Sequence, residues 1–256
     1  MKIAVSGKGG VGKTLLSAFL SRAFAAGGNK VIAIDADPDA NLGTTLGFPD
    51  VGKIVPISHL KDLIRQRTGA QESAGGLYFK LNPKVDDLPD DYSVSHDGIR
   101  LMVMGEVKKG GSGCYCPENA LLSSLMSHLL LGRDDVVIMD MAAGIEHLSR
   151  GTAQAVDRLI IVVEPGQASM ETALRVKQLA RDLGIKELAV VGNKVHGADE
   201  EAYIRRGTGG LDMLGVIPYD KGLVNAQMKG LPVIRSQVIK SAVDAIYAKL
   251  IAQQTK

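Results

Sequence analysis

The sequence predicts an α/β fold, a doubly wound and mostly parallel β-sheet flanked by helices. Two observations lead to this fold class. Short apolar runs that end in glycine or aspartate alternate along the chain with longer segments whose apolar residues recur at helical spacing. The first apolar run is followed by a glycine-rich loop and then by a helical segment, the order that starts a parallel sheet. At 256 residues the chain fits one large α/β domain or two small ones, and we expect a single domain over residues 1–256.

The first third of the chain contains two expected strands and one expected helix. Residues 2–5 are apolar and then break into glycines, which predicts a buried strand. Residues 13–26 carry apolar side chains at helical spacing, and the pair of glycines after them favours a helix end. Residues 30–34 predict a second strand. Residues 48–98 are the least regular part, with several prolines, glycines and aspartates, and we interpret them as an insertion on the sheet.

The remaining chain continues the alternation of strands and helices. The expected strands cover residues 99–104, 135–139, 158–163, 188–192 and 213–217. The expected helices cover residues 117–131, 169–183, 199–206, 220–229 and 237–253. The last of these helices has few basic residues beside its apolar positions, so we expect it to pack on the sheet rather than to bind a membrane.

The composition argues against nucleic-acid and membrane partners. The net charge of +2 gives no sign of a surface that seeks nucleic acid or lipid. The N-terminus runs directly into the glycine-rich loop, so no signal peptide is expected, and no apolar run approaches the roughly 18 residues of a membrane span. We therefore expect a cytoplasmic protein, in which closely spaced cysteines more often bind metal or do redox work than form a disulfide.

The loop after the first strand matches the P-loop pattern Gly-x-x-x-x-Gly-Lys-Thr, from Gly7 to Thr14. Its glycines allow backbone N–H groups to turn inward around phosphates. Lys13 is placed to reach the outer phosphates, and the Thr14 hydroxyl is a ligand for Mg²⁺. The residues expected to bind the nucleotide here are Gly9, Gly10, Val11, Gly12, Lys13, Thr14 and Leu15.

Lys8 indicates which group of P-loop proteins the loop resembles. The segment Lys-Gly-Gly-x-Gly-Lys-Thr over residues 8–14 resembles the deviant Walker A motif of the MinD, ParA and nitrogenase iron protein group. The resemblance implies that Lys8 reaches the phosphates of the nucleotide held by the other subunit of a dimer. A lysine there neutralises charge that develops in the transition state, much as an arginine finger does. The alternative is a solvated loop lysine.

Aspartates follow two of the expected strands. Asp35 and Asp37 follow the second strand, and Asp140 directly follows the strand expected at residues 135–139, which is the Walker B arrangement. Resemblance to the switches of the same group implies that Asp37 orients or activates the attacking water, while Asp35 and Asp140 support Mg²⁺ indirectly. The alternative for Asp37 and Asp39 is capping of a following turn or helix. The expected catalytic residues are Lys8, Lys13, Asp37 and Asp140.

Two further positions are candidates for reading the nucleotide base. Asn193 follows an expected strand, and its amide can donate to a ring acceptor and accept from the adenine amino group. Pro218 lies in a segment that looks like the second base-side loop of the group. The preference for ATP and ADP over guanine nucleotides rests on the resemblance. The alternative for Asn193 is a turn residue.

The only two cysteines of the chain, Cys114 and Cys116, are separated by one residue. In extended backbone they point to the same side, so both thiols can approach one ion, whereas a disulfide between them would close a strained ring. Thiolates favour Zn²⁺, Cu(I) or iron–sulfur clusters, and a site with four sulfurs needs two chains, as a symmetric dimer provides. The alternative is a pair of thiols with no metal role.

The whole chain resembles the CooC-type maturation ATPases of nickel-containing carbon monoxide dehydrogenase and the similar factor for acetyl-CoA synthase. The motifs that carry the resemblance are residues 8–14, 35–40, 105–111, 114–119, 139–148, 163–165 and 217–219. The family implies an ATPase that forms a homodimer with nucleotide, binds one Ni²⁺ or Zn²⁺ per dimer through both cysteine pairs, and assists nickel insertion into its client enzyme. Leu15 and Ala142 depart from the residues common in the wider group.

Two other functions remain open at this point. One is an ATP-dependent positioning or partitioning protein of the MinD or ParA class without a metal role, which needs a membrane-binding helix or a basic DNA-binding surface. The other is a reductase that carries a [4Fe–4S] cluster between subunits, as in the nitrogenase iron protein, whose two cysteines lie far apart in sequence.

Overall fold

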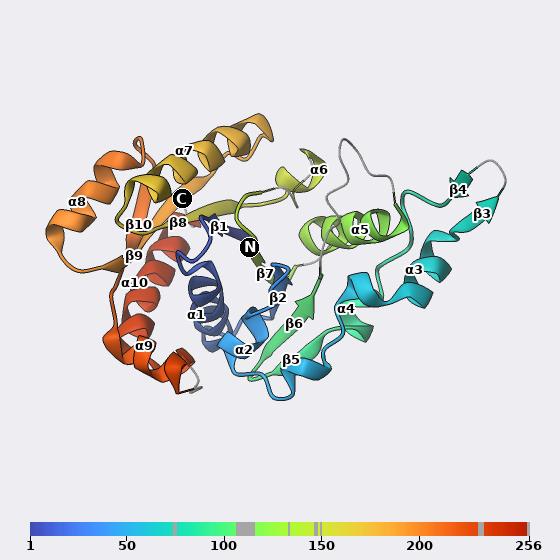
Figure 1. The fold of residues 1–256 in the computed structure, drawn as a ribbon, viewed down its shortest axis with the longest axis horizontal. Helices are drawn as coiled ribbons and strands as arrows, with labels where there is room; N and C mark the ends of the chain where they lie inside the picture. Colours follow the sequence, from blue (N-terminus) through green and yellow to red (C-terminus); the bar gives the residue numbers. More distant parts are fainter. Residues whose placement is uncertain are drawn as a thin grey trace.

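The computed structural model describes residues 1–73, 76–105, 116–132, 134–145, 148, 150–229 and 233–254. The strands are β1 (Lys2–Gly7), β2 (Val31–Ala36), β3 (Gln71–Ser73), β4 (Gly76–Tyr78), β5 (Val94–His96), β6 (Ile99–Val103), β7 (Val136–Met141), β8 (Arg158–Val163), β9 (Leu188–Val195) and β10 (Asp212–Pro218) (Figure 1). The α-helices are α1 (Lys13–Ala26), α2 (Leu42–Leu46), α3 (Lys61–Thr68), α4 (Leu88–Asp91), α5 (Pro117–Leu131), α6 (Arg150–Ala153), α7 (Gln167–Asp182), α8 (Ala198–Gly207), α9 (Lys221–Met228) and α10 (Gln237–Gln254). Short 3-10 turns are η1 (Val51–Lys53), η2 (Ile57–His59) and η3 (Val233–Arg235).

Eight strands form one sheet in the order β10-β9-β8-β1-β7-β2-β6-β5. All neighbouring pairs are parallel except β5 and β6, which are antiparallel. The carboxyl ends of the seven parallel strands therefore lie along one edge of the sheet, where ligands bind in open α/β sheets. The expected doubly wound α/β sheet is confirmed.

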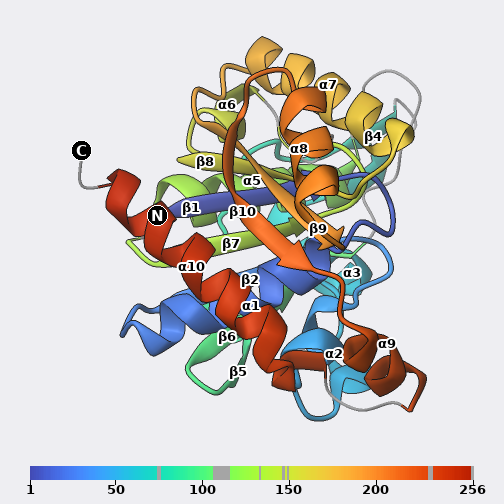
Figure 2. The same cartoon turned by 90° about the vertical axis from the view of Figure 1, so that its left-hand side faces the viewer.

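Helices cover both faces of the sheet because each buried strand presents alternate side chains to opposite sides. On β1, Ile3 and Val5 belong to the core beneath α1, α2 and α10, whereas Ala4 belongs to the core beneath α3, α5 and α7. Figure 2 shows α7 on one side of the central strands and α1 and α10 on the other. Continuous apolar strands such as Leu159 to Val163 are what a sheet buried on both faces requires.

The boundaries expected from sequence agree closely for the regular elements. The expected segments at residues 13–26, 117–131 and 158–163 have the bounds of α1, α5 and β8. The short helices α2 and α6 were not expected. Residues 48–98 contain α3, α4 and the hairpin strands β3 and β4, and they add β5 to the main sheet as its antiparallel edge. That residues 1–256 form one domain with this insertion stays a proposal.

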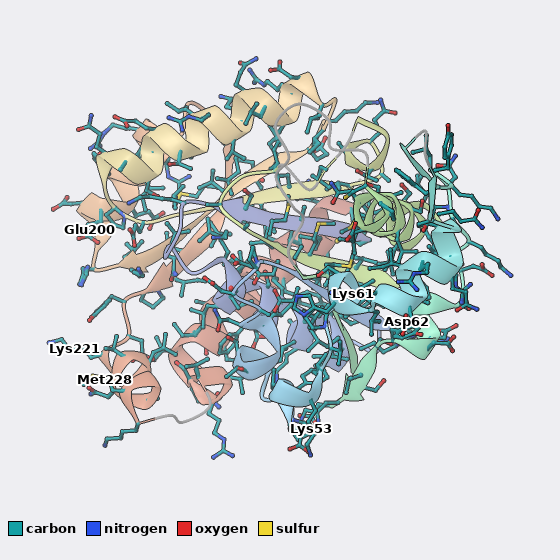
Figure 3. The ribbon with its side chains drawn as sticks, turned by 45° about the vertical axis from the view of Figure 1, so that its right-hand side comes forward. Lys53, Lys61, Asp62, Glu200, Lys221 and Met228 are labelled. Carbon is teal, nitrogen blue, oxygen red and sulfur yellow. The ribbon has the colours of Figure 1, made fainter. Side chains whose placement is uncertain are left out.

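The C-terminal helix α10 packs on the sheet. Ile239, Val243, Ile246 and Leu250 are buried in the same core as α1, as their helical spacing predicts. By contrast, α9 is poorly covered: Met228 is 82% exposed, and Figure 3 shows it with Lys221 at the outer edge of the molecule. Within the described ranges, no helix has the length and hydropathy that a membrane crossing requires.

Candidate functional site

The P-loop connects the central strand β1 to α1 at the carboxyl edge of the sheet. Gly10 and Gly12 adopt φ values of 79° and 98°, which favour glycine. Lys13 is buried, and its Nζ lies 3.4 Å from the carbonyl oxygen of Lys8, inside the curve of the loop. The loop opens into a cleft of about 930 Å³. The cleft is lined by P-loop residues 9, 10 and 12–15, by Asp37, Asp39, Asn41, Thr44, Thr45, Gly47, Phe48 and Val51, and by Ala142, Ala143 and Val233.

Asp140 lies beneath the P-loop and is fully buried. Its Oδ1 accepts a hydrogen bond of 3.2 Å from the Ser17 hydroxyl of α1. The pKa of Asp140 is raised to about 7, mainly by burial and also by the neighbouring Asp35 carboxyl, whereas Thr14, Lys13 and Ser17 oppose the shift. The low dielectric around this carboxyl therefore disfavours its charge in the absence of a cation.

The second oxygen of Asp140 fits a role near Mg²⁺. Oδ2 is buried and has no hydrogen-bond partner among the described residues. A buried carboxylate oxygen without a partner is costly, and a nearby cation or its bound water would satisfy it. With the Thr14 hydroxyl beside it, the donor set is of the oxygen type that Mg²⁺ prefers. The residues present therefore fit this ion.

Asp35 holds the loop after β2. It pairs with Asp140 in the register of β2 and β7, so both carboxyls lie at the same level of the sheet. Its Oδ2 accepts the Leu42 N–H at 2.9 Å and its Oδ1 accepts the Asp37 N–H at 3.3 Å. Burial raises the pKa of Asp35 to about 6, although these two backbone hydrogen bonds favour the charged form. In this structure Asp35 therefore shapes the loop that carries Asp37.

Asp37 and Asp39 both line the cleft. The Oδ1 of Asp37 accepts the backbone N–H of Asp39 at 3.1 Å, so Asp37 also stabilises the turn. The structure thus brings Asp37 to the cleft, and its role toward an attacking water stays a proposal. On the neighbouring strand end, the Ser6 hydroxyl donates to the Gly144 carbonyl at 2.6 Å and so ties β1 to the segment after β7.

The two candidate base readers lie at the ends of β9 and β10. Asn193 is buried, and its Nδ2 donates to the Val11 carbonyl of the P-loop at 2.7 Å. Its Oδ1 accepts the N–H of Lys194 at 2.9 Å. Pro218 ends β10, and the ring of the following Tyr219 stacks on His196, with centroids 4.7 Å apart. Base reading by Asn193 and Pro218 stays a prediction, and Asn193 in addition supports the P-loop.

Of the two cysteines, Cys116 lies within the described residues and Cys114 lies outside them. Cys116 is half-buried and precedes the first turn of α5 in extended conformation, with φ −124° and ψ 153°. The described part of the chain holds no group of three or more histidine, cysteine, aspartate or glutamate side chains that could bind a metal ion by itself.

Sequence reasoning missed three residues of this site: Ser6, Ser17 and Lys194. Ser17 comes three residues after Thr14 on the buried side of α1. A serine on an apolar helix face was the signal in the sequence that could have identified it. Ser6 had no such signal, because its partner is 138 residues away.

Gly10 and Gly12 form a matched pair for testing the P-loop. An added Cβ at Gly12 would lie 2.1 Å from Asn193 Nδ2, whereas one at Gly10 would meet nothing within 4 Å. We expect Gly10→Ala to lower the free energy of unfolding by about 1 kcal/mol through backbone strain alone. Gly12→Ala should cost at least about 1 kcal/mol more, because Asn193 must give up its bond to Val11. Urea unfolding curves measure both values. Adding Asn193→Ala should restore part of the loss only for Gly12→Ala, and equal losses in the two single variants would contradict the steric argument.

Comparisons with known proteins agree with this geometry. Residues 2–233 match the family model described as the CobQ/CobB/MinD/ParA nucleotide binding domain. The carbon monoxide dehydrogenase accessory protein CooC of Rhodospirillum rubrum is 48% identical over 233 residues, covering 90% of this chain and 88% of that protein. An uncharacterised ATP-binding protein of Methanocaldococcus jannaschii is 45% identical over 253 residues, covering 98% of each chain.

Solved structures share the fold at lower identity. The MinD cell division protein of Aquifex aeolicus superposes with a TM-score of 0.69 at 22% identity, covering 98% of this chain and 97% of that one. The septum site-determining protein MinD of Pyrococcus horikoshii, complexed with Mg-ADP, gives a TM-score of 0.67 at 19% identity and covers 99% and 98% of the two chains. At these sequence identities the structural similarity supports a shared fold and nothing further.

Proposed function

This chain belongs to the CobQ/CobB/MinD/ParA nucleotide-binding family and is a CooC-type ATPase, and we propose that it uses ATP to control a metal site shared between two subunits. The cargo is Ni²⁺ or Zn²⁺, bound through Cys114 and Cys116 of each subunit of a homodimer. The client is a nickel enzyme, either carbon monoxide dehydrogenase or acetyl-CoA synthase, into which the dimer assists nickel insertion.

The observation that carries this proposal is the edge of the sheet from which the chain runs to Cys116. Helix α5 follows β6, and β6 runs parallel to β2, β7 and β1. The segment from the end of β6 to Cys116 therefore begins at the carboxyl edge of the sheet, the edge that also bears the P-loop. Two subunits that meet at this edge through their P-loops would bring two such segments near one another, and an isologous contact supplies the missing thiolates in pairs.

The nucleotide site supports a switch driven by hydrolysis. We infer that Lys13 and the N–H groups of the P-loop bind the phosphates, and that Asp37 orients the attacking water. Thr14 and Asp140 would hold Mg²⁺, which supplies neutralising charge to the phosphates when bound. Loss of the γ-phosphate removes contacts to the loops that carry Asp37 and Gly144, so the two segments relax and the dimer geometry changes.

The cysteine pair is tested by replacing both thiols. In the Cys114→Ser, Cys116→Ser variant we expect metal binding to fall from one Ni²⁺ or Zn²⁺ per dimer to none under the same conditions. The reason is that a serine hydroxyl is a much poorer ligand for these ions at neutral pH than a cysteine thiolate. ADP affinity should stay within about two-fold, since neither cysteine lies in the P-loop. Elemental analysis after size exclusion, with and without ATP, measures the metal, and calorimetry measures ADP.

The histidine His128 on α5 provides a control, because it lies on the same helix at the opposite end from Cys116. His128→Gln should leave the metal content unchanged. If the double serine variant retained one ion per dimer, the site assignment would be wrong. If the wild-type protein bound no metal but pelleted with liposomes or DNA in the presence of ATP, the positioning class of ATPase would replace this proposal.

A further inference from the structure

Strand β9 contains a bulge next to the P-loop. Gly192 pairs with Val216 of β10, and Val195 pairs with Pro218, so three steps along β9 match two steps along β10. One residue of β9 is therefore extra, which defines a β-bulge. Within it, Lys194 adopts φ 57°, a left-handed conformation that is uncommon outside glycine, asparagine and aspartate. Such strain persists where surrounding contacts enforce it.

The bulge directs two adjacent side chains to the same loop. In a regular strand, Asn193 and Lys194 would point to opposite faces of the sheet. Here Asn193 Nδ2 donates to the Val11 carbonyl at 2.7 Å, and Lys194 Nζ donates to the Gly10 carbonyl at 2.8 Å. Both contacts bridge more than 180 residues of sequence. The strained conformation of Lys194 thus has a direct structural result, which is that two consecutive P-loop carbonyls are held.

Holding these carbonyls fixes the N–H groups that follow them. A trans peptide is planar, with its C=O and N–H pointing in opposite directions. If the Gly10 and Val11 carbonyls point toward β9, the N–H groups of Val11 and Gly12 must point away from it, into the loop. The Val11 N–H indeed points to the Lys8 carbonyl at 3.4 Å, the same oxygen that Lys13 Nζ approaches. The Gly12 N–H, which the same geometry directs away from β9, is of the kind that cradles phosphates.

Glu164 keeps the Lys194 ammonium in place. Its Oε2 lies 2.8 Å from Lys194 Nζ, and its backbone N–H donates to the Ser169 hydroxyl at 3.1 Å, at the start of α7. Glu164 directly follows β8, which lies between β1 and β9 in the sheet. The ion pair therefore joins the ends of β8 and β9 to the P-loop that leaves β1. Both side chains are partly exposed, so the effect on affinity should be moderate.

We propose that the β-bulge at Asn193 and Lys194, braced by Glu164, holds the P-loop in the conformation that binds phosphates. Lys194 and Glu164 are thus positioning residues for nucleotide binding, acting through the peptide groups of Gly10 and Val11. This inference rests on the nucleotide site of the proposed function but not on the metal or the dimer. It predicts that the loop loses affinity for phosphates when the Lys194 ammonium group is removed, although no atom of the loop itself is changed.

The test compares Lys194→Met with Lys194→Arg in the full-length protein. For Lys194→Met we expect the Kd for Mg-ADP and the KM for ATP to rise together by about five- to ten-fold, with kcat within about two-fold, because the P-loop N–H groups bind ground and transition states alike. Lys194→Arg should recover most of the affinity, since it can still donate to Gly10. Glu164→Gln should show a smaller rise in Kd.

Lys249 supplies a matched control. It also bridges a carbonyl and a carboxylate, Met213 O at 2.7 Å and Asp212 Oδ1 at 3.2 Å, and its side chain is similarly exposed. Met213 and Asp212 lie at the start of β10, at the far end from the P-loop. Lys249→Met should leave the Kd for Mg-ADP unchanged.

A backbone variant separates positioning from folding. Lys194→Gly relieves the positive φ but removes the ammonium, so its thermal midpoint should be no lower than that of Lys194→Met, while its Kd for Mg-ADP is raised as much. If Lys194→Met bound Mg-ADP as well as wild type, the inference would be overturned. It would also be overturned if, across the variants, the rise in the Kd for Mg-ADP simply followed the fall in the thermal midpoint of unfolding. Failure of the wild-type protein itself to bind Mg-ADP would instead overturn the nucleotide site.

Discussion

Replacing Asp140 with asparagine is expected to abolish ATP hydrolysis and, at the same time, to make the nucleotide-free protein harder to unfold above pH 7. The first effect should exceed about 100-fold, because the variant loses a buried negative charge beside the phosphates and their metal ion. The second effect follows from the raised pKa of Asp140, about 7 in the folded protein against 3.8 for an ordinary aspartate. One residue thus carries opposite contributions to function and to stability.

The sign of the pH dependence follows from proton binding. Between pH 4 and pH 7 the folded protein holds a proton on Asp140 that the unfolded chain has released, so the free energy of unfolding falls as pH rises through this interval. Each unit of pKa difference corresponds to about 1.4 kcal/mol, and the pKa of Asp35, about 6, adds to the same trend. Wild type should therefore lose a few kcal/mol of stability between pH 4 and pH 8 from this pair.

Asparagine removes the Asp140 share of that loss. Its amide nitrogen takes the position of Oδ2, which has no partner among the described residues, and this costs about 1–3 kcal/mol. At pH 8 the free energy of unfolding of Asp140→Asn should therefore exceed that of wild type by about 1 kcal/mol. Urea unfolding of wild type and Asp140→Asn at pH 5 and pH 8 measures it. Asp212→Asn is a control of opposite sign, because hydrogen bonds from Gln253 and Lys249 keep the pKa of Asp212 below its usual value. Parallel pH profiles for wild type and Asp140→Asn would contradict the assignment.

The elements that sequence predicted well are those whose local signals agree with their burial. Helix α5 begins at Pro117, which suits a first helical turn, and ends at a glycine, so both of its bounds were predictable. The strands are short apolar runs because both faces of the sheet are covered. Helix α2 lacked such signals: it has five residues, and its N-terminus is fixed by Asp35, whose carboxylate accepts the Leu42 N–H from seven residues away.

The parts of the site that sequence missed depend on contacts between distant strands. Motif spacing placed Lys13, Asp37 and Asp140, since each follows a recognisable strand, but it treated Asn193 only as a base reader. Its contact with Val11 depends on a bulge that appears only when β9 is paired with β10. Nothing local in the sequence reveals the positive φ of Lys194 or its two partners.

Replacing each of the two P-loop lysines with alanine is expected to affect nucleotide binding and ATP hydrolysis differently. Lys13 is buried with its Nζ inside the loop, so Lys13→Ala should weaken ADP binding by roughly 100-fold. Lys8 is exposed, and its side chain makes no hydrogen bond or ion pair with the described residues. We therefore expect Lys8→Ala to leave ADP affinity within about three-fold while ATP hydrolysis falls by about 1,000-fold, the scale of a missing arginine finger. Calorimetry with ADP and steady-state ATP hydrolysis measure the two effects.

Mixing two inactive variants then decides whether Lys8 acts across the dimer. A Lys8→Ala subunit keeps its own Asp140 but needs a lysine from its partner, and an Asp140→Asn subunit supplies that lysine although its own site is inactive. Random pairing makes half of the dimers mixed, each with one working site of two, so about a quarter of wild-type activity should return. Mixing Lys8→Ala with Lys13→Ala should restore a similar fraction, since the Lys13→Ala subunit also retains Lys8. If Lys8 acted on the nucleotide of its own subunit, neither mixture would regain activity, because no subunit in either would combine a working Lys8 with an intact site.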